Sequence, residues 1–201
     1  MDLRIGRLRI TPGAVFMTTL LVFLDRDGWA GLLLLAVTAH EAGHLAALGL
    51  CRAPVLYVEV SAAGVCIRYA GSLLSYGREL FVAAMGPAAG ALLALLAAWI
   101  GAAAEADRLL LLSGFSMALT AFNLLPLRGL DGGRMVRTLL CARFGPTAAD
   151  RVSEGLDAVF RILLIAFGVF LLSKQGSWTV LLAISAILLS LRRRQEYGRV
   201  L

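Results

Sequence analysis

The feature that most constrains this chain is an apolar run, residues 28–50, which carries His40, Glu41 and His44 near its middle. The run is long enough to cross a bilayer, which takes about 20 predominantly apolar residues. A charged side chain at the centre of an inserted helix costs about 2.5–3.5 kcal/mol, so such groups are usually functional. These two histidines are the only ones in the sequence. The run therefore predicts a membrane helix built around a polar site.

The spacing of the three polar residues predicts a metal site. Residues four apart share one face of a helix, so His40 and His44 can bind one ion together. Glu41 lies on a neighbouring face and can reach a water bound to that ion. This HExxH pattern is typical of zinc held by two imidazoles, with the glutamate as general base. The alternative, two hydrogen-bonded core histidines and an accidental glutamate, leaves three titratable groups in hydrocarbon unexplained.

The rest of the chain predicts an all-α polytopic membrane protein. The sequence has 201 residues, of which 60% are hydrophobic and 16% charged, whereas soluble domains are nearer half apolar and a quarter charged. We expect a single domain over residues 1–201, with no second soluble domain. About six transmembrane helices are predicted, at residues 11–24, 28–50, 80–104, 109–127, 156–172 and 177–191.

The distribution of basic residues predicts the topology. Six spans place both termini on one side of the membrane. The basic residues of the loops on the opposite side are only Arg26, Arg108 and Lys174. By the positive-inside rule, both termini are cytoplasmic in a multi-pass protein of the cell membrane. The net charge of +6 is then loop charge, and no nucleic-acid partner is expected because no basic patch alternates with aromatic residues. Within the fifth predicted span, Arg161 is expected to reach the interface or to pair with Asp157.

A catalytic zinc site normally has three protein ligands and one open position. The sequence has no third histidine, so an acid must serve, and the candidates in or near the spans are Glu59, Glu79, Asp131 and Asp157. We favour Asp131, which lies at the cytoplasmic end of the fourth predicted span, at the depth of the histidines. Pro126 ends regular helix there, and the nearby glycines allow a tight backbone around the acid. The alternative role for Asp131 is the N-cap of a helix that starts near Gly132.

These residues together carry a family resemblance. His40-Glu41-x-x-His44, followed by Asn123-x-x-Pro126 and Leu130-Asp131-Gly132, resembles the site-2 protease family of intramembrane zinc metalloproteases. The compact form is most similar to the bacterial stage IV sporulation protein FB group, whose chemistry faces the cytoplasm. The resemblance covers residues 28–140, which we take as the core. It differs in that no PDZ domain separates the motifs and no CBS domain is expected after them.

The resemblance implies roles for two residues that spacing alone does not assign. In the family, the aspartate of the LDG motif is the third zinc ligand, which implies that role for Asp131. The asparagine of the NxxP motif interacts with the substrate backbone or the reaction oxyanion, which implies that role for Asn123.

A β-hairpin is predicted within the polar segment after the HExxH. Residues 55–60 and 65–70 are rich in β-branched and aromatic side chains and flank a small-residue turn, which favours a hairpin near residues 55–70. The resemblance implies a membrane-associated β element that holds an extended substrate by strand addition. An ordinary cytoplasmic loop is the equal alternative.

The third predicted span contains Gly86 and Gly90 in a G-x-x-x-G arrangement. Glycines at this spacing allow another helix to approach closely, and Pro87 can kink the span. Core packing is the expected role, and only the resemblance suggests that the glycines lie near the site.

The sequence thus predicts an intramembrane zinc metalloprotease that holds one Zn²⁺ and acts in regulated intramembrane proteolysis. Glu41 takes a proton from the attacking water and passes one to the leaving amine, and Asn123 steadies the oxyanion. The expected partners are a membrane-associated protein substrate and the lipid bilayer, with a regulatory membrane protein as a further candidate. The alternative is a non-catalytic metal-binding membrane protein, either a transporter or a regulatory pseudoprotease. Glu41 argues against transport, which needs ligands but no general base.

Overall fold

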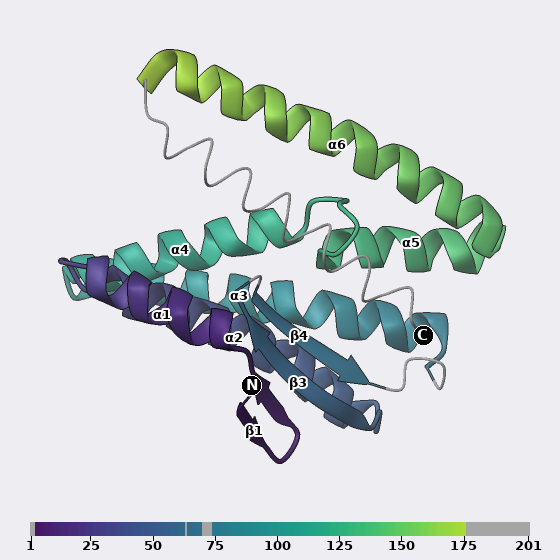
Figure 1. Ribbon diagram of the computed structural model, residues 1–201, viewed down its shortest axis with the longest axis horizontal. Coiled ribbons are helices and arrows are strands. Elements are labelled where there is room, and N and C mark those ends of the chain that lie inside the picture. Colours follow the sequence, from purple (N-terminus) through teal and green to yellow (C-terminus); the bar gives the residue numbers. More distant parts are fainter. Residues whose placement is uncertain (1–2, 63, 70–73, 176–201) are drawn as a thin grey trace. The chain divides into compact units, whose positions relative to one another are not determined.

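The computed structural model describes residues 3–62, 64–69 and 74–175, and the chain divides into two compact units (Figure 1). The first unit, Met1–Leu124, contains β1 (Leu3–Ile5), β2 (Leu8–Ile10), α1 (Pro12–Leu24), α2 (Trp29–Leu50), β3 (Val55–Ser61), β4 (Gly64–Tyr69), α3 (Tyr76–Ala103) and α4 (Asp107–Asn123). The second unit, Leu125–Leu201, contains α5 (Asp131–Phe144) and α6 (Pro146–Gln175).

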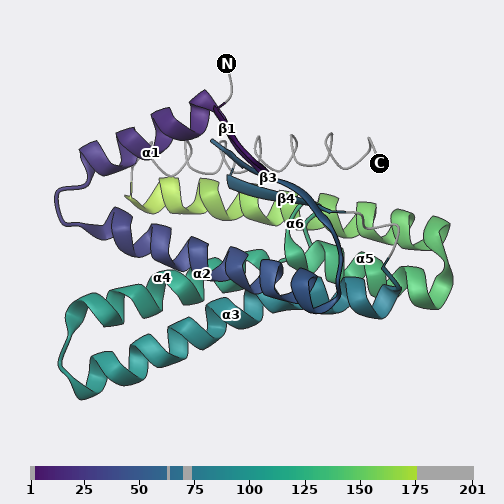
Figure 2. The same cartoon turned by 90° about the horizontal axis from the view of Figure 1, so that it is seen from below.

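Three helices form the body of the first unit. Helices α3 and α4 run side by side in opposite directions, and α2 packs against both (Figure 2). By length and apolar composition, α2 and α3 are each able to cross a membrane, and α1 is apolar but shorter. Two of the six predicted spans therefore pass this test, and the number of membrane-spanning helices stays a prediction. The predicted span at residues 177–191 lies outside the described residues.

A carboxylate from the preceding loop caps the start of α2. Asp25 accepts hydrogen bonds from the backbone N–H groups of Trp29 at 2.9 Å and Ala30 at 2.8 Å. The first N–H groups of a helix have no partner within the helix, and a negative charge is favoured beside them. The Ala30 N–H is the main cause that lowers the pKa of Asp25 below its ordinary value, and the Trp29 N–H adds to it. This cap fixes where the histidine-bearing helix begins.

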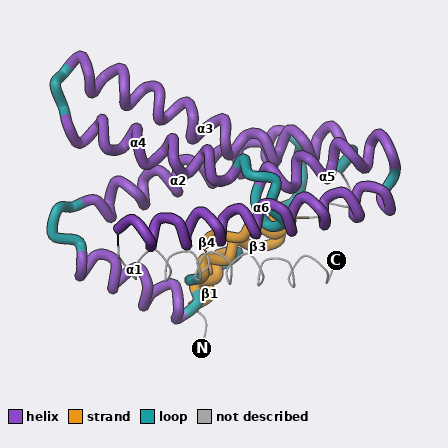
Figure 3. The backbone as a smooth tube through the Cα atoms, turned by 90° about the horizontal axis from the view of Figure 1, so that it is seen from above, coloured by secondary structure: helices purple, strands orange, loops and turns teal. Residues whose placement is uncertain are grey.

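The predicted hairpin is confirmed, and it belongs to a larger sheet. Strands β3 and β4 pair antiparallel, with Ser61 opposite Gly64 at the turn. The sheet has the order β1-β2-β3-β4, because an N-terminal hairpin adds β2 parallel to β3. Figure 3 draws the strands in orange. The guanidinium of Arg9 lies 3.9 Å above the ring of Tyr57 and ties the two hairpins together. The sequence analysis did not predict the N-terminal strands.

Two apolar clusters anchor α2 on either side of the histidines. The hairpin-side cluster joins Ala47 and Leu48 of α2 to Ala53 and to Val82 of α3. The helical cluster joins Ala36 of α2 to Ala97 of α3 and Leu112 of α4. Residues 40–44 lie between the two clusters along the helix. Because burial of apolar side chains stabilises both ends, the histidine turn is held in place by its flanks.

The second unit differs from the prediction in its boundaries. Residues 128–155, which lie between the fourth and fifth predicted spans, contain α5 and the first turns of α6. Helix α6 starts at Pro146, before the predicted span at 156–172. The predicted pairing of Arg161 with Asp157 is confirmed, with Nε and Oδ2 separated by 2.7 Å. Helix α4 ends at Asn123, four residues before the predicted end of the fourth span, so residues 124–130 form the connection to α5.

Candidate metal centre

His40 and His44 lie one turn apart in the middle of α2, and both side chains are buried. Their ring centroids are 5.0 Å apart, and the ring planes cross at 78°. Glu41 lies on the adjoining face and is half-buried. The arrangement puts two imidazoles and one carboxylate within five consecutive residues of a helix whose other side chains, apart from Thr38, are apolar.

A carbonyl of the neighbouring helix orients the ring of His44. Its Nδ1 donates a hydrogen bond of 2.8 Å to the carbonyl oxygen of Val82 in α3. A carbonyl can only accept, so the proton resides on Nδ1, and Nε2 carries the lone pair that a metal would use. Histidines that bind metals commonly donate their second nitrogen in this way. The tautomer of His44 therefore suits a ligand that binds through Nε2.

Three glycines near the imidazoles allow close approach of neighbouring atoms, and we call them the glycine cradle: Gly43 of α2 with Gly86 and Gly90 of α3. A Cβ at Gly86 would overlap Nε2 of His44, and a Cβ at Gly43 would overlap the carbonyl oxygen of Met85. A Cβ at Gly90 would overlap Oγ1 of Thr120 and lie 3.6 Å from Nδ1 of His40. The G-x-x-x-G pair in α3 thus allows close helix packing, as expected, and also bounds the site.

Helix α4 supplies two hydroxyl groups and Asn123. Ser116 donates a 2.8 Å hydrogen bond from its Oγ to the carbonyl of Gly90. Thr120 Oγ1 is buried, without a hydrogen-bond partner among the described residues. Asn123, the last residue of α4, is half-buried and donates from Nδ2 to the Leu119 carbonyl at 3.0 Å. Its amide is therefore held against the end of its own helix.

Asp131 belongs to the second unit, where it is the first residue of α5 and is buried. The N-cap position is occupied by Leu130, so Asp131 is not the cap that the alternative interpretation required. A carboxylate in the first turn is stabilised by the helix dipole. Gly129 has φ of 100°, a backbone conformation that glycine adopts without strain.

Two of the other acids that the sequence offered have other partners. Both carboxylate oxygens of Glu79 accept from the hydroxyl of Tyr69, at 2.8 and 2.9 Å. Asp157 binds Arg161 and the backbone of Arg128. His40 and His44 of the first unit and Asp131 of the second unit are each buried. Two imidazole nitrogens and one carboxylate oxygen form a common metal-binding donor set. This set is one that Zn²⁺ accepts.

One protein-family model matches part of the chain. Residues 102–167 match the model of Peptidase family M50. The matched segment contains Asn123 and Asp131 but not His40, Glu41 or His44, so this match does not depend on the HExxH residues. The chain matches none of the curated proteins.

A solved structure shares the fold. The chain is similar to the Site-2 Protease from Methanocaldococcus jannaschii, with a TM-score of 0.71 and 17% sequence identity over 96% of this chain and 94% of that one. At this identity the likeness shows the fold alone. The narrower resemblance to the stage IV sporulation protein FB group stays a prediction.

Proposed function

We propose that this chain is an intramembrane zinc metalloprotease that hydrolyses a peptide bond in or next to a membrane segment of its substrate. The observation that carries the proposal is the turn of α2 that holds His40, Glu41 and His44. Both histidines are buried there, and the Val82 carbonyl of α3 orients the His44 ring so that Nε2 is available as a ligand. The M50 match supports it from a separate stretch of the chain, and the fold of a site-2 protease agrees with it.

Each site residue has a role in the proposed reaction. His40, His44 and Asp131 would hold one Zn²⁺. When bound, such an ion lowers the pKa of water to about 7 and polarises a carbonyl. Glu41 takes the proton of the attacking water and passes one to the leaving amine. Asn123 donates a hydrogen bond to the substrate carbonyl, where negative charge develops.

The surface of the first unit suits a bilayer. Large apolar side chains are exposed along α1 and α3, among them Phe23 at 83% and Trp99 at 74%. Contiguous apolar surface of this kind marks contact with lipid or with a partner protein. We therefore keep the multi-pass arrangement with cytoplasmic termini, and place the catalytic chemistry nearer the cytoplasmic face, as parts of the proposal.

The hairpin offers a way to hold a substrate. Among the described residues, strand β4 is the last in the sheet order, and its one partner strand is β3. An extended peptide can add to such an edge through main-chain hydrogen bonds. A peptide bond within a helix is shielded by that helix, so strand addition would also keep the substrate unwound for attack.

The test co-expresses the chain with candidate single-span membrane proteins and compares it with Glu41→Gln. We expect cleavage by the native chain alone, with zinc retained in Glu41→Gln and reduced in His44→Ala. Equal cleavage by both forms would refute proteolysis at this site. Zinc binding without cleavage of any candidate would favour the non-catalytic alternative. Unchanged zinc affinity in Asp131→Ala would remove Asp131 as the third ligand.

A further inference from the structure

The connection between α4 and α5 is held together by its own backbone. Leu127 N–H donates to the Leu125 carbonyl at 2.7 Å, and Leu130 N–H donates to the Leu127 carbonyl at 3.0 Å. The side chains of Leu127 and Leu130 are buried. A Cβ at Gly133 would overlap the Leu127 carbonyl oxygen, so α5 packs directly on this connection. The residues that lead into Asp131 therefore form a compact structure that can transmit a displacement.

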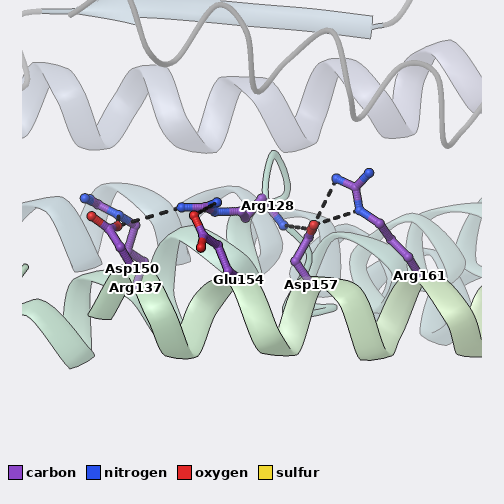
Figure 4. A network of polar contacts seen from close by, with 6 residues as sticks. All are labelled: Arg128, Arg137, Asp150, Glu154, Asp157 and Arg161. Carbon is purple, nitrogen blue, oxygen red and sulfur yellow. Dashed lines mark hydrogen bonds and ion pairs between the residues drawn. The ribbon is translucent and has the colours of Figure 1, made fainter. Parts of the chain in front are cut away.

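A buried carboxylate on α6 anchors this connection. Asp157, with 8% of its surface exposed, accepts a 2.8 Å hydrogen bond through Oδ1 from the backbone N–H of Arg128. Its Oδ2 lies 2.7 Å from Nε of Arg161 (Figure 4). Hydrogen bonds to an ionised acceptor are about twice as strong as neutral ones. Asp157 thus connects α6 to the main chain three residues before Asp131.

The other ion pairs of the same network differ in kind. Arg128 Nη1 lies 2.8 Å from Oε1 of Glu154, whose side chain is 59% exposed. Arg137 Nε lies 2.8 Å from Oδ1 of Asp150, which is 42% exposed. These pairs join side chains at the surface, where such contacts contribute about 0–1 kcal/mol. They provide matched controls in the same unit.

We propose that Asp157 is a positioning residue for Asp131, an inference that rests on the proposed function. Asp157 fixes the backbone of Arg128, the self-bonded connection carries that constraint to Leu130, and α5 begins one residue later. Losing the bond frees the connection and, with it, the carboxylate that is proposed to bind zinc. Groups that orient metal ligands typically change metal affinity about 10–100-fold when they are mutated.

A purely structural role makes a different prediction. If Asp157 only stabilises α6 through its ion pair, Arg161→Gln has the same effect as Asp157→Ala. If Asp157 acts through Arg128, Arg161→Gln leaves the acceptor of the Arg128 N–H in place, so zinc affinity falls much less than in Asp157→Ala. Asp157→Asn keeps an oxygen acceptor and restores most of the affinity that Asp157→Ala loses.

The experiment measures Zn²⁺ affinity of the full-length chain in detergent by competition with a chelator. We expect Asp157→Ala to lower affinity about 10-fold or more, with Asp157→Asn, Arg161→Gln and Glu154→Gln near the native value. In an Asp131→Ala background, Asp157→Ala should have no further effect, because the residue through which it acts is gone. Hydrogen exchange of the Arg128 amide should accelerate in Asp157→Ala while α5 and α6 stay protected.

Several results would overturn the inference. They are an Asp157→Ala affinity within about twofold of native, an equal loss in Arg161→Gln, or a loss that persists in the Asp131→Ala background. If the native chain binds zinc but the variants give any of these three results, the proposed function stands and the positioning role of Asp157 is refuted. If the native chain binds no zinc, both fail together, and unchanged Arg128 exchange in Asp157→Ala would refute the anchoring contact separately.

Discussion

Replacing Gly86 with alanine tests whether the glycine cradle sets the orientation of His44. In an open helical position this change stabilises by about 0.5–1 kcal/mol, because alanine loses less conformational freedom on folding. At Gly86 the new methyl group would overlap Nε2, Cε1 and Cδ2 of the His44 ring. The ring must then move, and its hydrogen bond to Val82 is lost or distorted.

The size of the effect follows from these contacts. Overpacking of a buried site costs about 1–3 kcal/mol, and a lost hydrogen bond costs about 0.5–1.5 kcal/mol. After the gain from alanine, we expect Gly86→Ala to lower the free energy of unfolding by about 1–3.5 kcal/mol. Zinc affinity should fall about 10-fold or more, since the Val82 carbonyl no longer fixes the ring.

Gly114→Ala in α4 is the matched control, because a Cβ there meets nothing within 4 Å. It should leave zinc affinity unchanged and leave stability equal or up to about 1 kcal/mol higher. The assay monitors the loss of secondary structure as each variant unfolds in detergent. Zinc titration of both variants accompanies it. If Gly86→Ala unfolds and binds zinc like Gly114→Ala, the reasoning about the cradle is wrong.

Three further outcomes are expected. Thr120→Val replaces a buried hydroxyl that has no hydrogen-bond partner among the described residues, so stability should hold or rise, whereas Ser116→Ala loses the bond to Gly90 and about 1 kcal/mol; paired unfolding curves decide this. Asn123→Ala should keep zinc but lower kcat about 10²–10³-fold if its amide stabilises the oxyanion, as measured on a cleaved substrate. The lowered pKa of Asp25 means that its contribution is complete above the ordinary aspartate pKa of about 3.9 and is lost as the pH falls through the lower folded-state value. Asp25→Asn should therefore flatten the acid side of a plot of melting temperature against pH.

The site helix and the hairpin were predictable because their signals are local. The apolar run around His40 and His44 forms one helix, α2, and the β-branched runs near residues 55–70 form β3 and β4. Both patterns depend on neighbours within a few residues, so one-dimensional reasoning is sufficient.

Helix α5 was predicted only through the alternative that placed a helix start near Gly132, because the partners of this helix are distant in sequence. Arg134, Arg137 and Arg143 made residues 128–155 resemble a loop by hydropathy. In the fold, Arg137 pairs with Asp150 at the start of α6. That pairing lowers the pKa of Asp150 below its usual value, chiefly through the Arg137 hydrogen bond. A helix whose charged side chains pair with those of a second helix does not produce an apolar run in the sequence. Composition alone therefore could not reveal α5.

The sequence predicted part of the glycine cradle. The G-x-x-x-G spacing indicated close packing, but which helix approached Gly86 and Gly90 depends on tertiary contacts. The structure shows that the approaching atoms are imidazole atoms and a threonine hydroxyl. Sequence reasoning that asks which polar groups would fill a glycine gap, as well as which backbones it admits, would have linked Gly86 to His44.

The two apolar clusters on either side of residues 40–44 have a consequence for how the centre assembles. Packing and a carbonyl partner already set the direction of the His44 ring. This imidazole is therefore preorganised before an ion arrives, and binding of the ion does not have to order α2. In a zinc finger, by contrast, metal binding itself drives folding. On the proposed function, chelation should therefore abolish proteolysis while α2 stays folded, and proteolysis should return when zinc is restored.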